Sequence, residues 1–438
     1  MICKIGRKAM AQMQAKPEFF CLLFLLGLDF LLMAFGNYGL YFIDNYTIMP
    51  CMLFLGILMR RRLSSPARKI LVVGLVFSLW FLATQMIHFA TDLNSRPLGG
   101  FLSVFLLAFP FASAVEDERE QAGLKMAGFA YIGAGLVLAL LAGMLFLDMV
   151  PGFLRYHVYW FRTRLYTMAH PNICASIFMI GCGFSLAFIG LWRNKWLKIA
   201  SVVTYFLFLG LMVLTNSRTT ILMTIAMTGC FAFFAVFRCG DKKRILAAVV
   251  AMVLVSGVLL VCTNGLRDIH TEWLAAQDAQ QETAPEEVPS AGGQGTFQED
   301  IRTLNGRTTI WASAVRAMVD VPVRMIWGTD HSEALLITYP PYRLEHAHNA
   351  WLETALCMGI PGLAVSLLLT GLAVWSIVGI LFGSRYDLWQ KGICLLMLFM
   401  MGAAMLEPYL FLTDRYYHYT NVAFFLSLGY AVRWRKST

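Results

Sequence analysis

The sequence predicts an all-α integral membrane protein with about twelve transmembrane helices and a large loop containing amphipathic helices. Of the 438 residues, 58% are apolar and only 14% are charged, whereas soluble proteins average about 25% charged residues. The apolar residues form long blocks, such as 132–147 and 199–214. Each block approaches the ~20 residues that a helix needs to cross the hydrocarbon core. A membrane β-barrel would instead need shorter segments of alternating polarity.

The spans follow from these apolar blocks. The basic N-terminus resembles a signal peptide, but its apolar stretch is long and no small-residue cleavage site follows, so we expect an uncleaved first span. The chain then divides into helices 1–9 within residues 1–263, an extracytoplasmic loop at 264–359, and helices 10–12 within residues 360–438. The predicted spans are residues 18–36, 39–59, 69–90, 98–114, 124–149, 171–191, 197–215, 219–237, 245–263, 360–382, 390–412 and 417–433.

The basic residues indicate which side of the membrane each loop occupies. Of the 35 basic residues, the predicted spans place 23 on the side of the N-terminus and 12 on the other side. Because cytoplasmic loops carry an excess of basic residues, we expect the first side, with both termini, to be cytoplasmic. Every lysine falls there, which accounts for the net charge of +9 without a nucleic-acid partner. The outer side carries only arginine, which suits bidentate phosphate binding, although orientation and genomic bias would also produce this split.

Two loops on the expected outer side stand out. Residues 151–170 combine three arginines with six aromatic side chains, which is typical of an interfacial aromatic belt or of a surface that stacks sugars and holds anions. Residues 264–347 are far longer than an ordinary connection. Within them, 277–298 is rich in Gln, Glu, Pro, Ala and Gly and is predicted to be mobile. Apolar residues recur at helical spacing over 301–319 and predict an amphipathic surface helix.

Two arginines lie where lipid alone does not demand them. Arg218 follows Ser217 in a very tight turn between two predicted spans, so its side chain either snorkels to the headgroups or binds a ligand. Arg307 lies at the start of the predicted surface helix, four residues before Trp311. If Asn305 caps this helix, Arg307 lies beside free backbone N–H groups that attract anions. A solvated arginine on a surface helix explains the second site equally well.

Two histidines, His346 and His348, end the long loop. Residues two apart do not share a helix face, and no third ligand is evident, so this pair is a poor metal site. A neutral histidine at the membrane surface is suited to general-base catalysis, although a lone histidine is usually structural. The 10 cysteines include no CxxC pair and are interpreted as small buried hydrophobic residues. We therefore predict neither a metal nor a cofactor.

The arginine and histidine motifs, in their order along the chain and on the expected outer side, resemble those of the O-antigen ligase / O-antigen polymerase superfamily of bacterial lipid-linked glycan transferases. The likeness covers about residues 160–365, while the first five spans match only in hydropathy. His346 precedes His348 by two residues but lacks the Asn and Leu that follow His348 at the family spacing. The matching motifs are H-[N/S]-x-x-L at His348-Asn349-Ala350-Trp351-Leu352, Ser-Arg at Ser217-Arg218, G-R-x-x-x-W at Gly306-Arg307-Thr308-Thr309-Ile310-Trp311, and P-N at Pro171-Asn172.

The resemblance implies a metal-independent, inverting glycosyltransferase of the bacterial cytoplasmic (inner) membrane, with its active site on the outer face. The donor would be a glycan on undecaprenyl diphosphate, and the acceptor a sugar hydroxyl of a second glycan or glycolipid, with membrane lipids around both. His348 would be the general base, and Arg218 and Arg307 would stabilise the leaving diphosphate. Further substrate contacts are expected from Arg164, His170, Asn172, Ser217, Trp311, His346 and Asn349.

Three other interpretations stay open. A polymerase of the same superfamily would add the glycan to another glycan repeat, whereas a ligase would use lipid A-core, a protein or another terminal acceptor; the single helix-and-histidine arrangement of the loop favours a ligase. Asp29 and Glu407, within predicted spans, are compatible with a transporter of polyprenyl-linked glycans or lipids, although most polar candidates lie at one face. A membrane sensor is disfavoured, because a mobile segment and a short helix do not form a folded sensory domain.

Overall fold

The computed structural model describes residues 63–88, 104–105, 107–116, 121–151, 158–161, 164–167, 171–237, 241–281, 307–328, 347–408, 410–411 and 418–436. Nearly all of these residues are helical. The helices, in chain order, are α4 (Ser65–His88), α6 (Ala108–Glu116), α7 (Ala122–Phe146), α8 (Pro171–Leu191), α9 (Lys195–Leu214), α10 (Arg218–Val236), α11 (Lys242–Gln281), α13 (Arg307–Val319), α14 (Pro322–Trp327), α16 (Ala350–Leu381), α17 (Leu388–Ala404) and α18 (His418–Lys436).

Several described helices correspond to predicted spans. In the part of the chain that the structure describes, 7 helices are long and apolar enough to cross a membrane: α4, α7, α8, α9, α10, α11 and α16. The shorter apolar helix α17 and the helix α18 occupy the last two predicted spans. The predicted spans 18–36 and 39–59 lie outside the described residues, and 98–114 is described only in part. The helical membrane fold is therefore confirmed, and the number of twelve spans stays a prediction.

Helix α11 is longer than the sequence predicts, with 40 residues. It continues through the first part of the predicted loop 264–359 and through residues 277–281 of the segment predicted to be mobile. Its length of about 60 Å is about twice the hydrocarbon thickness. Residues 264–281 contain no proline and many favourable helix formers, such as Leu, Arg, Glu, Ala and Gln, so the polar continuation stays helical. Residues 282–298 lie outside the described residues.

A β-hairpin is the exception to the predicted all-α fold. Strands β1 (Val158–Phe161) and β2 (Arg164–Thr167) pair antiparallel, with Trp160 opposite Leu165 and Phe161 opposite Arg164. The aromatic residues of this segment favour strand over helix. Because side chains alternate along a strand, Trp160 and Leu165 share one face and Arg164 lies on the other. Leu165 is fully buried, and the hairpin packs on α7 and α8.

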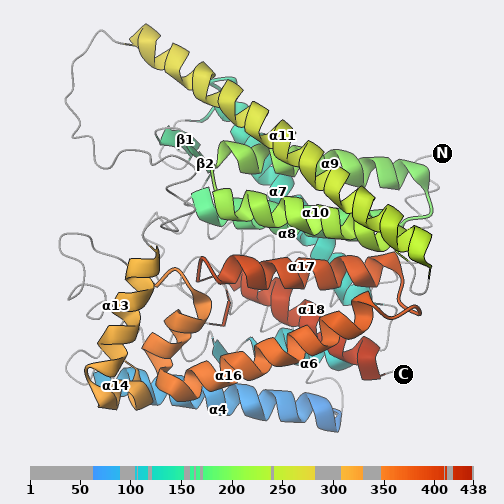
Figure 1. Ribbon diagram of the computed structural model, residues 1–438. Helices are drawn as coiled ribbons and strands as arrows, with labels where there is room; N and C mark the ends of the chain where they lie inside the picture. Colours follow the sequence, from blue (N-terminus) through green and yellow to red (C-terminus); the bar gives the residue numbers. More distant parts are fainter. Residues whose placement is uncertain are drawn as a thin grey trace.

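The helices form two groups that lie side by side (Figure 1). One group contains α7 to α11, and the other contains α4, α6, α16, α17 and α18. The groups meet where α8 and α10 pack on α17. Gly183 of α8 lies against Leu396, and Gly392 of α17 lies against Ala187, because small residues let helices approach closely. The hairpin, α13 and α14 lie at one end of this bundle (Figure 1), which we call the hairpin end.

Helix α14 packs closely on α16 near Gly328 and Gly359. Gly328 (φ 73°) and Gly359 (φ 66°) both have a backbone conformation that suits glycine. A side chain at Gly359 would meet the carbonyl of Ile326. The Trp80 indole donates to the Met358 carbonyl at 2.9 Å. This break divides α16 at Gly359, where the predicted loop 264–359 meets the predicted span 360–382.

Candidate active site

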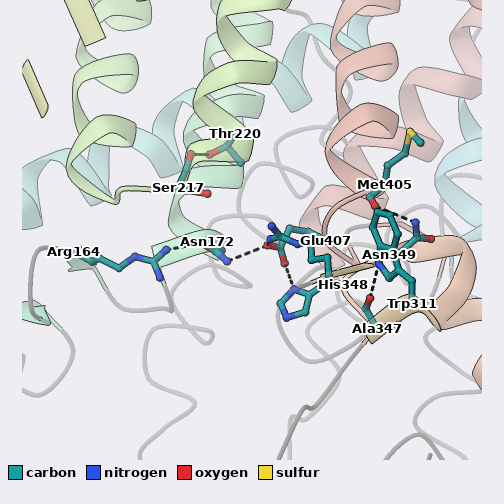
Figure 2. A network of polar contacts seen from close by, with 11 residues as sticks. Arg164, Asn172, Ser217, Thr220, Trp311, Ala347, His348, Asn349, Met405 and Glu407 are labelled. Atoms are coloured by element: carbon teal, nitrogen blue, oxygen red, sulfur yellow. Dashed lines mark hydrogen bonds and ion pairs between the residues drawn. The ribbon is translucent and has the colours of Figure 1, made fainter. Parts of the chain in front are cut away.

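The carboxylate of Glu407 is the centre of a polar network at the hairpin end. Glu407 lies just after α17 and is only 2% exposed. One oxygen, Oε1, accepts from Arg307 Nη2 at 2.6 Å and from Asn172 Nδ2 at 3.3 Å. The other, Oε2, lies 3.1 Å from His348 Nδ1. Asn172 comes from one helix group, Glu407 and His348 lie at helix ends of the second, and Arg307 begins α13. The network therefore bridges the two groups, as Figure 2 shows.

The backbone of His348 has an uncommon conformation that its neighbours hold in place. Its φ is 50°, which is uncommon for a residue other than glycine. On one side, Ala347 N donates to Glu353 Oε2 at 2.6 Å and Ala347 O accepts from Trp311 Nε1 at 3.1 Å. On the other side, Asn349 Oδ1 caps α16 by accepting from the N–H groups of its first turn. These contacts fix the direction of the imidazole ring.

Asn349 also ties this loop to Glu407. Its Nδ2 donates to the carbonyl of Met405 at 3.0 Å, two residues before Glu407 (Figure 2). Asn349 therefore connects the start of α16 to the end of α17. The distance between His348 and Glu407 is therefore set both by this hydrogen bond and by the direct contact between the two side chains.

Arg164 reaches the network from the hairpin. Its Nη2 donates to Asn172 Oδ1 at 2.6 Å, and its Nε donates to the Thr215 carbonyl at 3.0 Å. Figure 2 shows Arg164, Asn172, Glu407 and His348 in one row. Asn172 is at the second position of α8 and carries both a donor and an acceptor in its amide. It therefore links a guanidinium group to a carboxylate without being charged itself.

Arg218 begins α10, after a tight turn in which Asn216 has φ 52°. It is half-buried, and the guanidinium groups of Arg267 and Arg164 lie close enough to act on its charge. Ser217 is buried, and its carbonyl accepts from the Thr220 hydroxyl at 2.9 Å. Figure 2 shows this Ser217–Thr220 contact apart from the row of residues around Glu407. Ser217 therefore shapes the turn that presents Arg218.

The structure brings together five of the predicted site residues, namely Arg164, Asn172, Arg307, His348 and Asn349, through Glu407 and its neighbours. Trp311 contacts the same loop through Ala347. Arg218 and Ser217 lie in the turn that Arg164 contacts at Thr215. The predicted residues His170 and His346 lie outside the described residues.

Sequence reasoning did not assign Glu407 or Glu353 to the site. In the sequence, Glu407 is a charge within a predicted span and is compatible with a transporter. The sequence does contain a signal for Glu407, which is a carboxylate next to Pro408 in an apolar segment. A charge inside a membrane is costly unless it is paired, so such a carboxylate needs a partner. Glu353 has a weaker signal, since it follows the histidine motif directly and is 7% exposed.

This arrangement can remove a proton and stabilise negative charge. An ionised carboxylate only accepts hydrogen bonds, so Glu407 favours the tautomer of His348 with the proton on Nδ1 and a basic lone pair on Nε2. The adjacent guanidinium groups favour anions. Among the described residues, no three His, Cys, Asp or Glu side chains gather where they could hold a metal ion. The metal independence of the reaction stays a prediction.

Comparison with known proteins gives one family. Residues 203–367 match the family model described as O-Antigen ligase, and no curated protein matches the chain. The matched region includes Arg218, Arg307 and His348, whereas Asn172 precedes it and Glu407 follows it. The match confirms the resemblance recognised in the sequence, and it supports the assignment of the chain to the O-antigen ligase/polymerase superfamily.

Proposed function

We propose that this protein is a glycosyltransferase that moves a glycan from undecaprenyl diphosphate to a sugar hydroxyl of an acceptor, as an O-antigen ligase. The family match indicates a membrane glycan enzyme of the O-antigen ligase or polymerase type. One observation carries the finer proposal: His348 Nδ1 lies 3.1 Å from the buried carboxylate of Glu407. A histidine oriented by a carboxylate is an arrangement that activates hydroxyl nucleophiles.

In the proposed reaction, His348 Nε2 takes the proton of the acceptor hydroxyl as its oxygen attacks the anomeric carbon of the donor. A new C–O bond forms on the face opposite the bond to the diphosphate, which breaks, so the configuration is inverted. The diphosphate leaves with the bonding electron pair, and the proton stays on His348. Glu407 holds the ring and stabilises the imidazolium that forms. The diphosphate linkage of the donor supplies the free energy.

The arginines have different tasks in this proposal. Arg218, with Arg164 and Arg267 nearby, provides concentrated positive charge for the leaving diphosphate. Arg307 is already paired with Glu407 at 2.6 Å. Its Nε atom is buried and has no hydrogen-bond partner among the described residues, so Arg307 can hold Glu407 and still offer one N–H to the substrate. The role predicted for both arginines therefore falls mainly to Arg218.

We also propose that the hairpin end faces away from the cytoplasm in the bacterial cytoplasmic membrane. The lysines of the described chain support this orientation, because Lys195, Lys198, Lys242 and Lys243 lie at the helix ends opposite the hairpin. Both chain termini would then be cytoplasmic. The prenyl chain of the donor would lie among membrane lipids, with its diphosphate at the outer interface beside Arg218.

The alternatives differ in their products. A polymerase with the same chemistry would use a second glycan repeat as acceptor instead of lipid A-core. A transporter would move the glycan without forming a bond. Glu407, which is compatible with a transporter, is accounted for by its contacts with Arg307 and His348, because a paired carboxylate in a membrane protein needs no transport pathway to explain it.

The test is a transfer assay with the purified full-length protein in vesicles that contain glycan-linked undecaprenyl diphosphate. Lipid A-core and a soluble glycan repeat are offered separately, both in EDTA. We expect a new glycosidic product from the wild type, no product from His348→Ala, and strongly reduced product from Arg218→Ala. Arg316→Ala, an exposed arginine of α13 at the same end, is the matched control and should retain activity.

Each outcome of this assay decides between the alternatives. Product on lipid A-core indicates a ligase, and product on the glycan repeat indicates a polymerase. Movement of the donor across the vesicle membrane without a new bond would contradict the proposal and favour a transporter. Full activity of a folded His348→Ala variant would exclude His348 as the base.

A further inference from the structure

A second cluster of side chains at the hairpin end surrounds His270, away from Glu407. The rings come from three elements: Phe146 ends α7, Trp160 is in β1, and His270 and Trp273 are in α11. The ring centroids of Trp160 lie 5.0 Å from His270, 5.8 Å from Trp273 and 5.3 Å from Phe146. We call these four residues the aromatic cluster.

One ring nitrogen of His270 has no hydrogen-bond partner among the described residues. The residue is 7% exposed, and this nitrogen, Nε2, is buried. A buried ring nitrogen without a partner costs free energy in either tautomer. The rings beside it are more open, since Phe146 is 43% exposed and both tryptophans are half-buried. The cluster therefore offers a ligand an apolar face next to an unsatisfied polar atom.

Arg267 lies near both the aromatic cluster and Arg218. Gly229 of α10 lies against Ser256 of α11, and the helices run antiparallel. Arg218 is eleven residues before Gly229, and Arg267 is eleven residues after Ser256, so equal rise per residue brings the two arginines to the same level. The charge of Arg267 acts on Arg218. Arg267 and His270 are three residues apart and are therefore neighbours on the surface of α11.

We propose that Arg267 and the aromatic cluster bind the diphosphate and the first sugar of the lipid-linked donor. This subsite rests on the proposed function, because it takes the same donor. Along α11, Arg267 lies closer to the membrane and His270 and Trp273 lie farther out, which matches the order of prenyl chain, diphosphate and sugar in the donor. The apolar C–H face of a pyranose packs on an indole ring, and a sugar hydroxyl satisfies His270 Nε2.

An interfacial aromatic belt would explain part of this cluster. Belt residues place separate aromatic rings at the level of the lipid headgroups. Here Trp160 and Trp273 lie against a buried histidine, and Phe146 lies against both tryptophans. An arginine lies one turn away on the same helix. A lipid headgroup does not require that arrangement, whereas a sugar with both an apolar face and hydroxyl groups fits it.

The test measures the affinity of the full-length protein in nanodiscs for two probes: undecaprenyl diphosphate and undecaprenyl diphosphate that carries one hexose. We expect Trp273→Leu to weaken binding of the hexose-bearing probe about fivefold to tenfold and to leave the bare diphosphate unchanged. Arg267→Ala should weaken both probes about tenfold or more. Trp196→Leu, 64% exposed at the opposite end, and Arg316→Ala are the matched controls and should change neither affinity.

The outcomes separate this proposal from the proposed function. Equal affinities of Trp273→Leu and wild type for the hexose-bearing probe would overturn the sugar subsite, and so would an equal loss for both probes, which would indicate membrane anchoring. If Trp273→Leu does not fold, Trp160→Leu in the hairpin is measured with the same criterion. Wild-type protein that binds the sugar selectively but forms no product would contradict the proposed function and leave the subsite intact.

Discussion

The two arginine-containing regions at the hairpin end differ in the charges that surround them. Arg307 is paired with the buried carboxylate of Glu407 at 2.6 Å, and the same carboxylate contacts His348. Arg218 instead lies near two other guanidinium groups, those of Arg164 and Arg267. One region thus pairs an arginine with a carboxylate, and the other brings the charges of several arginines together.

This difference suits the two regions to different roles. Removing charges from water is costly, so a compensated group such as Arg307 with Glu407 is stable without a ligand and can hold a catalytic side chain in place. A group of like charges such as Arg218, Arg164 and Arg267 is stabilised when an anion binds. In the proposed reaction, the first region serves proton transfer and the second holds the diphosphate. Asn172 connects the two through one amide.

The largest effect on turnover is expected when the negative charge of Glu407 is removed. Glu407→Gln keeps the shape of the side chain but no longer compensates Arg307 or the imidazolium of His348. We expect turnover at saturating donor to fall about 100-fold and the thermal unfolding midpoint in detergent to fall as well, because Arg307 is left unpaired. Glu407→Asp, which keeps the charge, should be the milder variant. A Glu407→Gln turnover within about threefold of the wild type would contradict the role of the carboxylate.

The connection between the two regions is tested at Asn172. Asn172→Ala removes the acceptor for Arg164 at 2.6 Å and the donor to Glu407 at 3.3 Å. We expect turnover to fall about tenfold, in line with the loss of one or two hydrogen bonds to charged groups. Asn194→Ala removes an amide that caps α9 at the opposite end and is the matched control, with an effect on stability but not on turnover. Equal turnover losses in both variants would indicate a general effect on folding.

A smaller effect is expected at Trp311, which supports the compensated region only indirectly. Trp311→Phe keeps an aromatic ring but removes the 3.1 Å hydrogen bond to the Ala347 carbonyl. We expect turnover to fall about threefold to fivefold, as for the loss of one neutral hydrogen bond, with donor affinity unchanged. Trp196→Phe is the control. A loss above about 100-fold would mean that Trp311 contacts the substrate directly.

Much of the fold follows from local sequence, because an apolar block long enough to cross the membrane is visible without tertiary information. The spans at 171–191 and 197–215 correspond closely to α8 and α9. The end of α11 was missed because polar helix formers continue a helix as well as they form a loop. The hairpin was missed because its aromatic residues were interpreted as an interfacial surface and not as strands.

The candidate site was predictable only in part, for a similar reason. His348, Arg218 and Arg307 lie in short motifs, which the sequence displays directly. Glu407 is 59 residues from His348 and 100 residues from Arg307, and no local pattern records those contacts. The role of Asn172 as a link between Arg164 and Glu407 likewise depends on the packing of α8 against α17.

The most direct measurement is a pair of values, donor affinity and turnover, for Arg218→Ala and His348→Ala in the same vesicles. The account predicts that His348→Ala lowers turnover about 1000-fold with donor affinity within about twofold of wild type. Arg218→Ala should weaken donor binding about tenfold or more, because one of three clustered positive charges is lost. Equal losses of affinity in both variants, or an Arg218→Ala variant that binds the donor as wild type does, would contradict the division between the two regions.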